Sequence, residues 1–332
     1  MRILTQLSRL LLSAHSGKLA QLRPTEISSM WFKNLIFFRL EKPFAYTPET
    51  LEESLEKMSF TPCGKHELSS LGWSSPMGKL SEMRVHAGSG AMMICAKKEE
   101  RILPASVIRE FVNDKVEAIE EAEMRKIRKK ERDTIKDEVI LDLAPKAFTR
   151  SSQTWAIILP KQSLLIVDAS SSKKADEFTT LLRKTLTDTP LKLPQVQPAP
   201  SETLTLWLSN PDNTPNDLEI GDECELLEPG EEGSLVRCRR QDLASNEIMA
   251  HLEAGKNVVK LGVTWDEKLS FILSDDLSIK RLKYSDELVE DASGKDDTDA
   301  ATRFDAEFTL MALELGLFIP RLLEFFGGEV VD

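Results

Sequence analysis

A short stretch of the chain gathers enough positive charge to bind a polyanion. Residues 124–134 hold six Lys or Arg side chains, although the whole chain has a formal net charge of -12. If residues 104–143 form one long charged helix, five cations fall at offsets 0, 3, 4, 7 and 11, namely Arg125, Arg128, Lys129, Arg132 and Lys136. At about 3.6 residues per turn these offsets make a single stripe. A nucleic-acid backbone could lie along such a stripe.

The same run also fits a solvated helix face that is stabilised by ion pairs. Glu117 and Glu121 precede the run on the same helical face, and Glu121 lies four residues before Arg125. That spacing is typical of a helix-stabilising ion pair. Taken alone, the run fits this second interpretation better, because runs of charge usually mark exposed helices.

The composition indicates a core-forming protein with one large or two ordinary domains. The chain has 332 residues, of which 41% are hydrophobic and 30% are charged. No run approaches the roughly 18 consecutive apolar residues that span a bilayer, so we expect no membrane partner. The four cysteines, Cys63, Cys95, Cys224 and Cys238, are scattered without a CxxC pair. They indicate small buried hydrophobic residues in a reducing compartment, not a disulfide framework or a zinc site.

The sequence contains none of the short motifs that usually carry catalysis or bind a cofactor. It has no GxxxxGK[ST] loop, no GxSxG turn and no HExxH helix. No histidine has a second histidine at metal-ligand spacing. We therefore expect a protein that is not an enzyme and has no metal and no cofactor, although an enzyme without such motifs is not excluded.

Residues 1–29 differ in composition from the rest of the chain. Before Glu26, the first acidic residue, the charged side chains are four Lys or Arg, and the apolar residues fall on one helical face. The segment fits a basic amphipathic targeting or membrane-surface helix. It also fits residues that precede a working start at Met30. We favour the second interpretation and predict that residues 1–29 are a non-native or mobile extension.

Strands, hairpins and helices alternate along the remaining residues. This pattern predicts an α+β fold with antiparallel sheets and hairpins, one long charged helix over 104–143 and a C-terminal helix over 304–326. Apolar and β-branched runs predict strands at 31–40, 83–85, 91–96, 155–159, 164–168, 203–208, 223–227, 235–239, 258–263, 269–273 and 279–284.

Four prolines within residues 190–201 predict a linker, because proline fits neither a helix interior nor a central strand. The linker divides the chain into two α+β regions. Residues 30–200 form an N-terminal region that contains the long charged helix. Residues 201–332 form a C-terminal region with a three-strand meander and the terminal helix.

Several short motifs occur in an order and at spacings that are specific to one family. They are Met30–Leu35 (MWFKNL), Phe60–Gly64 (FTPCG), Lys97–Pro104 (KKEERILP), Lys136–Val139 (KDEV), Ser152–Thr154 (SQT), Arg240–Leu243 (RQDL), His251–Lys256 (HLEAGK), Lys280–Lys283 (KRLK) and Arg303–Ala306 (RFDA). Together they resemble RdgC, the bacterial recombination-associated DNA-binding protein family. The resemblance covers nearly the whole chain from Met30 to about Gly328.

The resemblance implies a protein without catalytic activity that binds double-stranded DNA without sequence preference. It further implies a ring-shaped homodimer with a positively charged hole, which restrains RecA-dependent recombination in the cytoplasm, on the nucleoid. RecA would be affected indirectly through DNA. An acidic exterior around a basic hole would explain the negative net charge, and such binding needs phosphate contacts, not base readout.

The resemblance also suggests individual residues. Phe148 matches an interface phenylalanine of the family, although a core position is the usual role of such a residue. Arg240 and Gln241 match a pair at which the family's ring is thought to close. Cations on or beside the meander that could line the hole are Lys256, Lys260, Arg281 and Lys283. Since alternate strand residues face opposite sides, Arg281 and Lys283 should share a face.

Two other functions remain open from the sequence. The chain could be a nucleoid adaptor that recruits a protein partner and binds DNA only incidentally. It could also be an unrecognised nuclease, although its carboxylates lack the spacing of a two-metal site.

Overall fold

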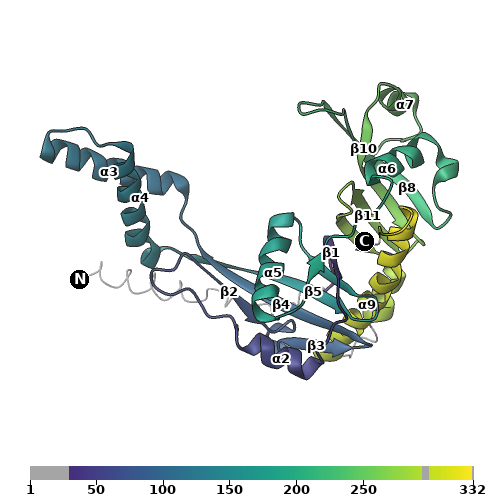
Figure 1. Cartoon of the computed structure of the whole chain (residues 1–332), viewed down its shortest axis with the longest axis horizontal. Helices are drawn as coiled ribbons and strands as arrows, with labels where there is room; N and C mark the ends of the chain where they lie inside the picture. Colours follow the sequence, from purple (N-terminus) through teal and green to yellow (C-terminus); the bar gives the residue numbers. More distant parts are fainter. Residues whose placement is uncertain (1–29, 294–298, 331–332) are drawn as a thin grey trace, which may run out of the picture. The chain divides into compact units, whose positions relative to one another are not determined.

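The computed structural model describes residues 30–293 and 299–330. From Trp31 onward, the described residues form one compact unit. The expected extension over residues 1–29 lies outside the described residues. The strands, some of which are labelled in Figure 1, are β1 (Leu35–Leu40), β2 (Ser69–Ser74), β3 (Val85–Gly88), β4 (Ala91–Arg101), β5 (Thr149–Leu159), β6 (Leu164–Asp168), β7 (Leu191–Lys192), β8 (Leu218–Leu227), β9 (Leu235–Arg239), β10 (Asn257–Trp265), β11 (Leu269–Ser274) and β12 (Ile279–Tyr284). The helices are α2 (Pro48–Glu56), α3 (Ala105–Glu123), α4 (Lys129–Leu143), α5 (Ser172–Thr185), α6 (Pro200–Ser209), α7 (Asn246–Glu253), α8 (Asp286–Ser293) and α9 (Ala300–Phe325).

Twelve strands of the described residues join into one sheet. Their order is β2-β4-β5-β6-β1-β12-β11-β10-β8-β9, with β3 paired to β4 and β7 paired to β1. All these strand pairs are antiparallel. The predicted α+β class with antiparallel sheets is therefore confirmed.

The expected single helix over residues 104–143 is wrong. The segment forms two helices, α3 and α4, because Met124 ends α3 in the left-handed conformation with a φ of 50°. The two helices pack antiparallel through a small core of Val112, Val116, Ile135 and Val139. We call this helical hairpin the arm.

The turn of the arm is stabilised by the charges that suggested a continuous stripe. Arg125 binds Glu131 at 2.6 Å, and Lys126 binds Glu120 at 2.6 Å. The expected pairing of Arg125 with Glu121 is replaced by pairing with Glu123 and Glu131. Residues 105–143 contain no glycine or proline, so the sequence carries no local signal for the break.

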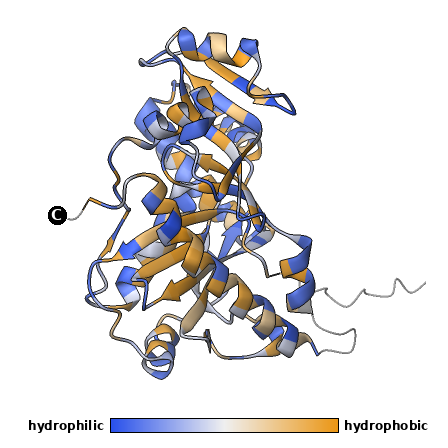
Figure 2. Cartoon of the chain, turned by 90° about the vertical axis from the view of Figure 1, so that its right-hand side faces the viewer, coloured by the Kyte–Doolittle hydropathy of each residue, from blue (hydrophilic) through white to orange (hydrophobic). Residues whose placement is uncertain are grey.

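The sheet region formed by β4, β5 and β6 is covered on both faces, which explains its continuous apolar strands. On one face, Phe178 of α5 packs edge-on against Trp73, with ring centroids 5.4 Å apart. Ile157 and Ile166, which lie outside that cluster, are also fully buried. Figure 2 shows how strongly apolar residues concentrate on the strands. A strand that is buried on both faces loses the usual alternation of apolar and polar residues.

Helix α9 confirms the predicted C-terminal helix and packs against strands of both regions. Its Phe308 contacts His86 of β3, with ring centroids 5.0 Å apart. Near its other end, Phe318 contacts Phe271 of β11, also at 5.0 Å. Among the described residues, no helix combines the length and apolar character needed to cross a membrane.

The proline-rich segment 190–201 is more ordered than a free linker. β7 pairs with β1, Val196 forms a bridge with Glu329, and Pro200 begins α6. Proline fits both places, because it is tolerated at a sheet edge and in the first turn of a helix.

Residues 203–208, which we expected to form a strand, lie in α6. Their buried members Thr203, Leu204, Trp207 and Leu208 follow a helical period. The strand prediction for this short apolar run is therefore wrong, because its buried residues have the period of a helix and not the alternation of a strand.

The two predicted regions meet where the sheet is most weakly paired. Leu35 pairs with Ile279 as the one register pair between β1 and β12, whereas β1 and β6 share five. We therefore keep the division into residues 30–200 and 201–332 as a proposal.

Candidate nucleic-acid interface

One group of cations lies on the β8–β12 part of the sheet. We call it the basic sheet face, and its members are Arg237, Arg239, Lys260, Arg281 and Lys283. On β8 and β9, the buried thiols Cys224 and Cys238 alternate with charged neighbours, so that the charged side chains point away from the core. Arg281 and Lys283 line the same hollow of about 260 Å³. The expectation that these two residues share a face therefore agrees with their placement.

Two carboxylates on the basic sheet face each form ion pairs with two of its cations. Glu223 binds Arg239 at 2.7 Å and Arg281 at 2.5 Å. Glu225 binds Lys260 at 2.6 Å and Arg237 at 3.0 Å. Burial disfavours the charged form of Glu225, but Lys260 and Arg237 outweigh it and lower the pKa of this carboxyl. Glu223 and Glu225 carry two negative charges against the five cations, and Asp222, which lines the hollow beside Arg281 and Lys283, adds a third, so the face keeps a small excess of positive charge.

Lys256 does not belong to the basic sheet face. It is buried, with 9% of its surface exposed, and its ammonium group binds Glu228 at 3.4 Å and the side chain of Ser234. A phosphate cannot reach it without breaking these contacts. The expectation that Lys256 lines a DNA path is therefore not supported by its placement.

A second basic site lies between the extended strands β4 and β5 and the first turn of α5. We call it the β4–β5 pocket. It has a volume of about 390 Å³ and is lined by cations, hydroxyls and two carboxylates. Register pairing brings Lys98 opposite Ser152 and Ala96 opposite Thr154. The pocket thus unites two of the motif segments recognised in the sequence, Lys97–Pro104 and Ser152–Thr154.

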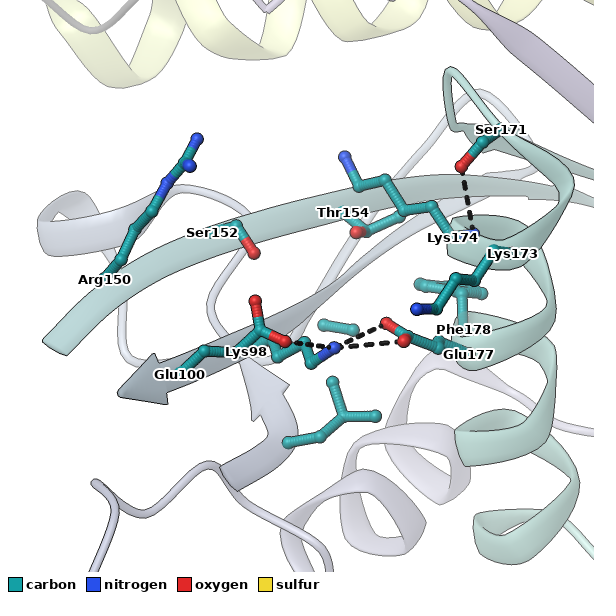
Figure 3. A pocket seen from close by; sticks show the side chains of 12 residues that line it. Lys98, Glu100, Arg150, Ser152, Thr154, Ser171, Lys173, Lys174, Glu177 and Phe178 are labelled. Atoms are coloured by element: carbon teal, nitrogen blue, oxygen red, sulfur yellow. Dashed lines mark hydrogen bonds and ion pairs between the residues drawn. The ribbon is translucent and has the colours of Figure 1, made fainter. Parts of the chain in front are cut away.

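The floor and the rim of the β4–β5 pocket differ in charge balance, as Figure 3 shows. At the floor, the Lys98 ammonium binds Glu177 at 3.0 Å and Glu100 at 2.7 Å. Burial opposes the charge of Lys98, but these hydrogen bonds outweigh it and raise the pKa of Lys98. At the rim, Arg150 and Lys174 point away from the floor. Neither forms an ion pair within residues 30–293 and 299–330, so both can meet an external anion.

The arm brings together only part of the predicted stripe. Lys129, Arg132 and Lys136 lie on α4 with helical spacing, whereas Arg125 and Arg128 precede that helix. Arg125 is already held by two carboxylates. Arg132 and Lys136 line a mainly apolar groove of about 470 Å³ between α3 and α4. The single five-cation stripe does not form, because the chain reverses at Met124.

Phe148 lies at the base of the arm, immediately before β5, and is 86% exposed. Its carbonyl oxygen accepts a hydrogen bond of 2.8 Å from the backbone of Ile102, a residue that is 49% exposed. A core position for Phe148 is therefore excluded in the single chain. Exposed aromatic side chains of this kind often anchor protein interfaces.

Arg240 and Gln241 lie in the loop between β9 and α7, as expected. Arg240 is exposed and has a φ of 53°, and the side chain of Gln241 donates to Glu247 at 3.0 Å. The loop therefore presents one available guanidinium and one amide that a partner could take over from Glu247.

Sequence reasoning missed several of these cations. Arg237 and Arg239 could have been found from their alternation around Cys238 in a predicted strand. Lys98, Arg150 and Lys174 come from three distant segments, and no sequence spacing connects them.

Comparison with known proteins places the chain in a family. The family model described as "RdgC: Putative exonuclease, RdgC" matches residues 30–329, which is most of the chain. The chain belongs to the RdgC family. The resemblance recognised from the motifs is thereby confirmed.

Curated relatives within the RdgC family cover the chain to a similar extent. The recombination-associated protein RdgC of Aeromonas hydrophila is 46% identical over 300 residues, which are 90% of this chain and 99% of that protein. The protein of the same name from Pseudomonas aeruginosa is 44% identical over 303 residues, or 91% of this chain and 99% of that protein.

Within the described residues, no group of three or more His, Cys, Asp or Glu is arranged to hold a metal ion.

Proposed function

We propose that this RdgC-family protein binds double-stranded DNA without sequence preference. The observation that carries the proposal is the excess of exposed cations in the β4–β5 pocket and on the basic sheet face of a chain with net charge -12. Local positive potential attracts a polyanion even when the total charge is negative. Lys, Arg and Ser side chains contact phosphates, which carry no sequence information.

The proposed active form is a homodimer that closes into a ring around DNA and restrains RecA-dependent recombination. Its place is the cytoplasm, on the nucleoid. Support for self-association comes from Phe148, whose exposed ring is costly to leave in water. The names of the relatives connect those proteins with recombination, and coating of DNA would hinder a recombinase without direct contact.

Duplex binding should weaken steeply with salt and vary little with sequence. Each neutralised phosphate should contribute about 0.9 to the slope of log affinity against log salt. Fluorescence anisotropy with several unrelated duplexes at a series of salt concentrations measures both properties. Strong preference for one sequence, or affinity that is indifferent to salt, contradicts the proposal.

Two alternatives can be separated in the same experiments. The adaptor function is favoured by exposed apolar residues of the arm, since Met124 is 90% and Phe111 is 48% exposed. Such an adaptor would bind DNA weakly and without the expected salt slope. The family's description as an exonuclease motivates a nuclease test, in which labelled linear DNA is incubated with the protein and Mg²⁺. Shortened products would overturn the assignment as a non-enzyme.

We further propose that Arg240 and Gln241 form a small contact that closes the ring. The double variant Arg240→Ala/Gln241→Ala should remain a dimer, because the larger contact lies elsewhere. Its salt slope on linear DNA should fall by about one phosphate equivalent. Release from closed circular DNA should accelerate much more than release from linear DNA, because only a circle is trapped by a closed ring. Dissociation rates after a salt jump measure this difference, and equal acceleration on both substrates would limit these residues to phosphate contact.

A further inference from the structure

Two of the four cysteines, Cys224 and Cys238, lie side by side on neighbouring strands. Cys224 of β8 and Cys238 of β9 are direct cross-strand partners in an unshifted antiparallel register. Their thiols are free, and Cys238 is close enough to Cys224 to raise the pKa of that thiol. They are 2% and 7% exposed. By contrast, Cys63 and Cys95 have no cysteine as a strand partner in the described residues.

The backbone register of this pair places the two Cα atoms within the range of a disulfide. The backbone of Glu228 donates to Ser234 at 3.1 Å, and both residues continue the register of β8 and β9. Because hydrogen-bonded pairs alternate along antiparallel strands, Cys224 and Cys238 also occupy a hydrogen-bonded position. The Cα atoms of such pairs are about 5.5 Å apart, within the range of about 4.4–6.8 Å found in disulfides. Their Cβ atoms are at the wide end of the cross-strand range of about 4.5–5.5 Å, whereas a disulfide needs about 3.5–4.5 Å, so the bond forms only when β9 shifts toward β8.

We propose that Cys224 and Cys238 are a disulfide-forming pair, which a peroxide oxidises and which then fastens β9 to β8. β9 has only β8 as a neighbour on the sheet path. It carries Arg237 and Arg239 and leads directly into Arg240 and Gln241. The bond would therefore restrain a strand that pairs with the rest of the sheet along one edge only. This inference does not depend on DNA binding.

The reaction needs only the two thiols and hydrogen peroxide. The sulfur of Cys238 attacks one peroxide oxygen, the O–O bond breaks, and water leaves with the thiol proton to give a sulfenic acid. The sulfur of Cys224 then attacks the sulfenic sulfur, the S–S bond forms, and the S–O bond breaks. The departing hydroxide takes the Cys224 proton as a second water. Cys238 reacts first because it lies on the edge strand, where local opening exposes it.

Burial of the two thiols limits the rate of this reaction. Desolvation, together with the neighbouring Cys238, raises the pKa of Cys224 to about 12. Cys224 therefore stays a protonated thiol at neutral pH and is a slow nucleophile. Oxidation should follow opening of β9 and should be slower than oxidation of a freely exposed thiol.

Peptide mapping of the full chain tests the bond. The reduced protein is treated with hydrogen peroxide, digested without reductant and analysed by mass spectrometry. We expect a peptide pair joined through Cys224 and Cys238 with two hydrogens fewer than the free thiols, while Cys63 and Cys95 stay unlinked. Cys224→Ser should abolish the linked species. Oxidation of Cys238 to a sulfinic acid with Cys224 still free, or an unchanged pair while Cys63 is oxidised, would overturn the proposal.

Amide hydrogen exchange tests the mechanical effect separately. A disulfide that closes residues 224–238 constrains the open state, so exchange in β9 should slow on the order of a hundredfold in the oxidised protein. The variant Cys224→Ser/Cys238→Ser should show no change after the same treatment. If the linked peptide forms but exchange in β9 stays the same, the bond does not fasten this strand.

Discussion

Reversing two charges at the rim of the β4–β5 pocket should remove most of the proposed affinity for duplex DNA. The variant is Arg150→Glu/Lys174→Glu, which changes the two cations that point away from the pocket floor. We expect affinity to fall by about one to two orders of magnitude for all sequences alike. The salt slope should fall by about two phosphate equivalents. Anisotropy titrations of wild type and variant at several salt concentrations provide both values.

The fold should tolerate this double change. Neither side chain has an ion pair to lose in the part of the chain that the structure describes. Lys174 lies in the first turn of α5, where a negative charge is favourable to the helix dipole. Circular dichroism and thermal unfolding should therefore match those of wild type.

A matched control separates a local site from total charge. Lys57→Glu/Lys65→Glu changes the net charge equally, but both lysines are exposed and line neither basic surface. This control should keep nearly all of its affinity and salt slope. An equal loss in both double variants would mean that only net charge matters, and an unchanged Arg150→Glu/Lys174→Glu variant would remove the pocket from the DNA path.

Replacing Phe148 by serine should convert the proposed dimer to a monomer without unfolding the chain. The ring is 86% exposed in the single chain, so its removal leaves no cavity in the core. Buried in a subunit contact, it should contribute about 2 kcal/mol or more to association, as central aromatic anchors do. Light scattering over a range of protein concentrations measures the dimer, and circular dichroism measures the fold.

The control for this variant is Leu193→Ser. Leu193 is 55% exposed and lies just after β7, away in sequence from the arm and its base. It should remain a dimer with an unchanged fold. If Phe148→Ser also stays dimeric at the same concentrations, Phe148 is no anchor. If it unfolds, its role is structural and the interface assignment is wrong.

The local sequence pattern predicted the structure correctly where residues close together in the sequence determine it. The pattern of apolar and β-branched runs predicted many of the antiparallel strands, and Arg281 and Lys283 line one hollow even though the register of β11 and β12 shifts beside Arg281. It failed for residues 203–208, because a short apolar run fits both a strand and a buried helix until its packing is known.

The break in the arm shows what local pattern could not decide. Every residue between 105 and 143 is compatible with a helix, so propensity predicts one continuous element. The antiparallel packing of Val112 and Val116 on Ile135 and Val139 requires a reversal, and Met124 provides it. Tertiary packing therefore outweighed local preference and divided the expected cation stripe.

The sequence by itself determined the fold class, the terminal helix and the family. Only the tertiary structure decided which cations are available. It buried Lys256 against Glu228, gathered Lys98, Arg150 and Lys174 around one pocket, and placed Cys224 opposite Cys238. The physical reason is that the charge and the periodicity of a segment depend only on residues that are neighbours in the sequence. Exposure and pairing depend on contacts between segments that the chain brings together only when it folds.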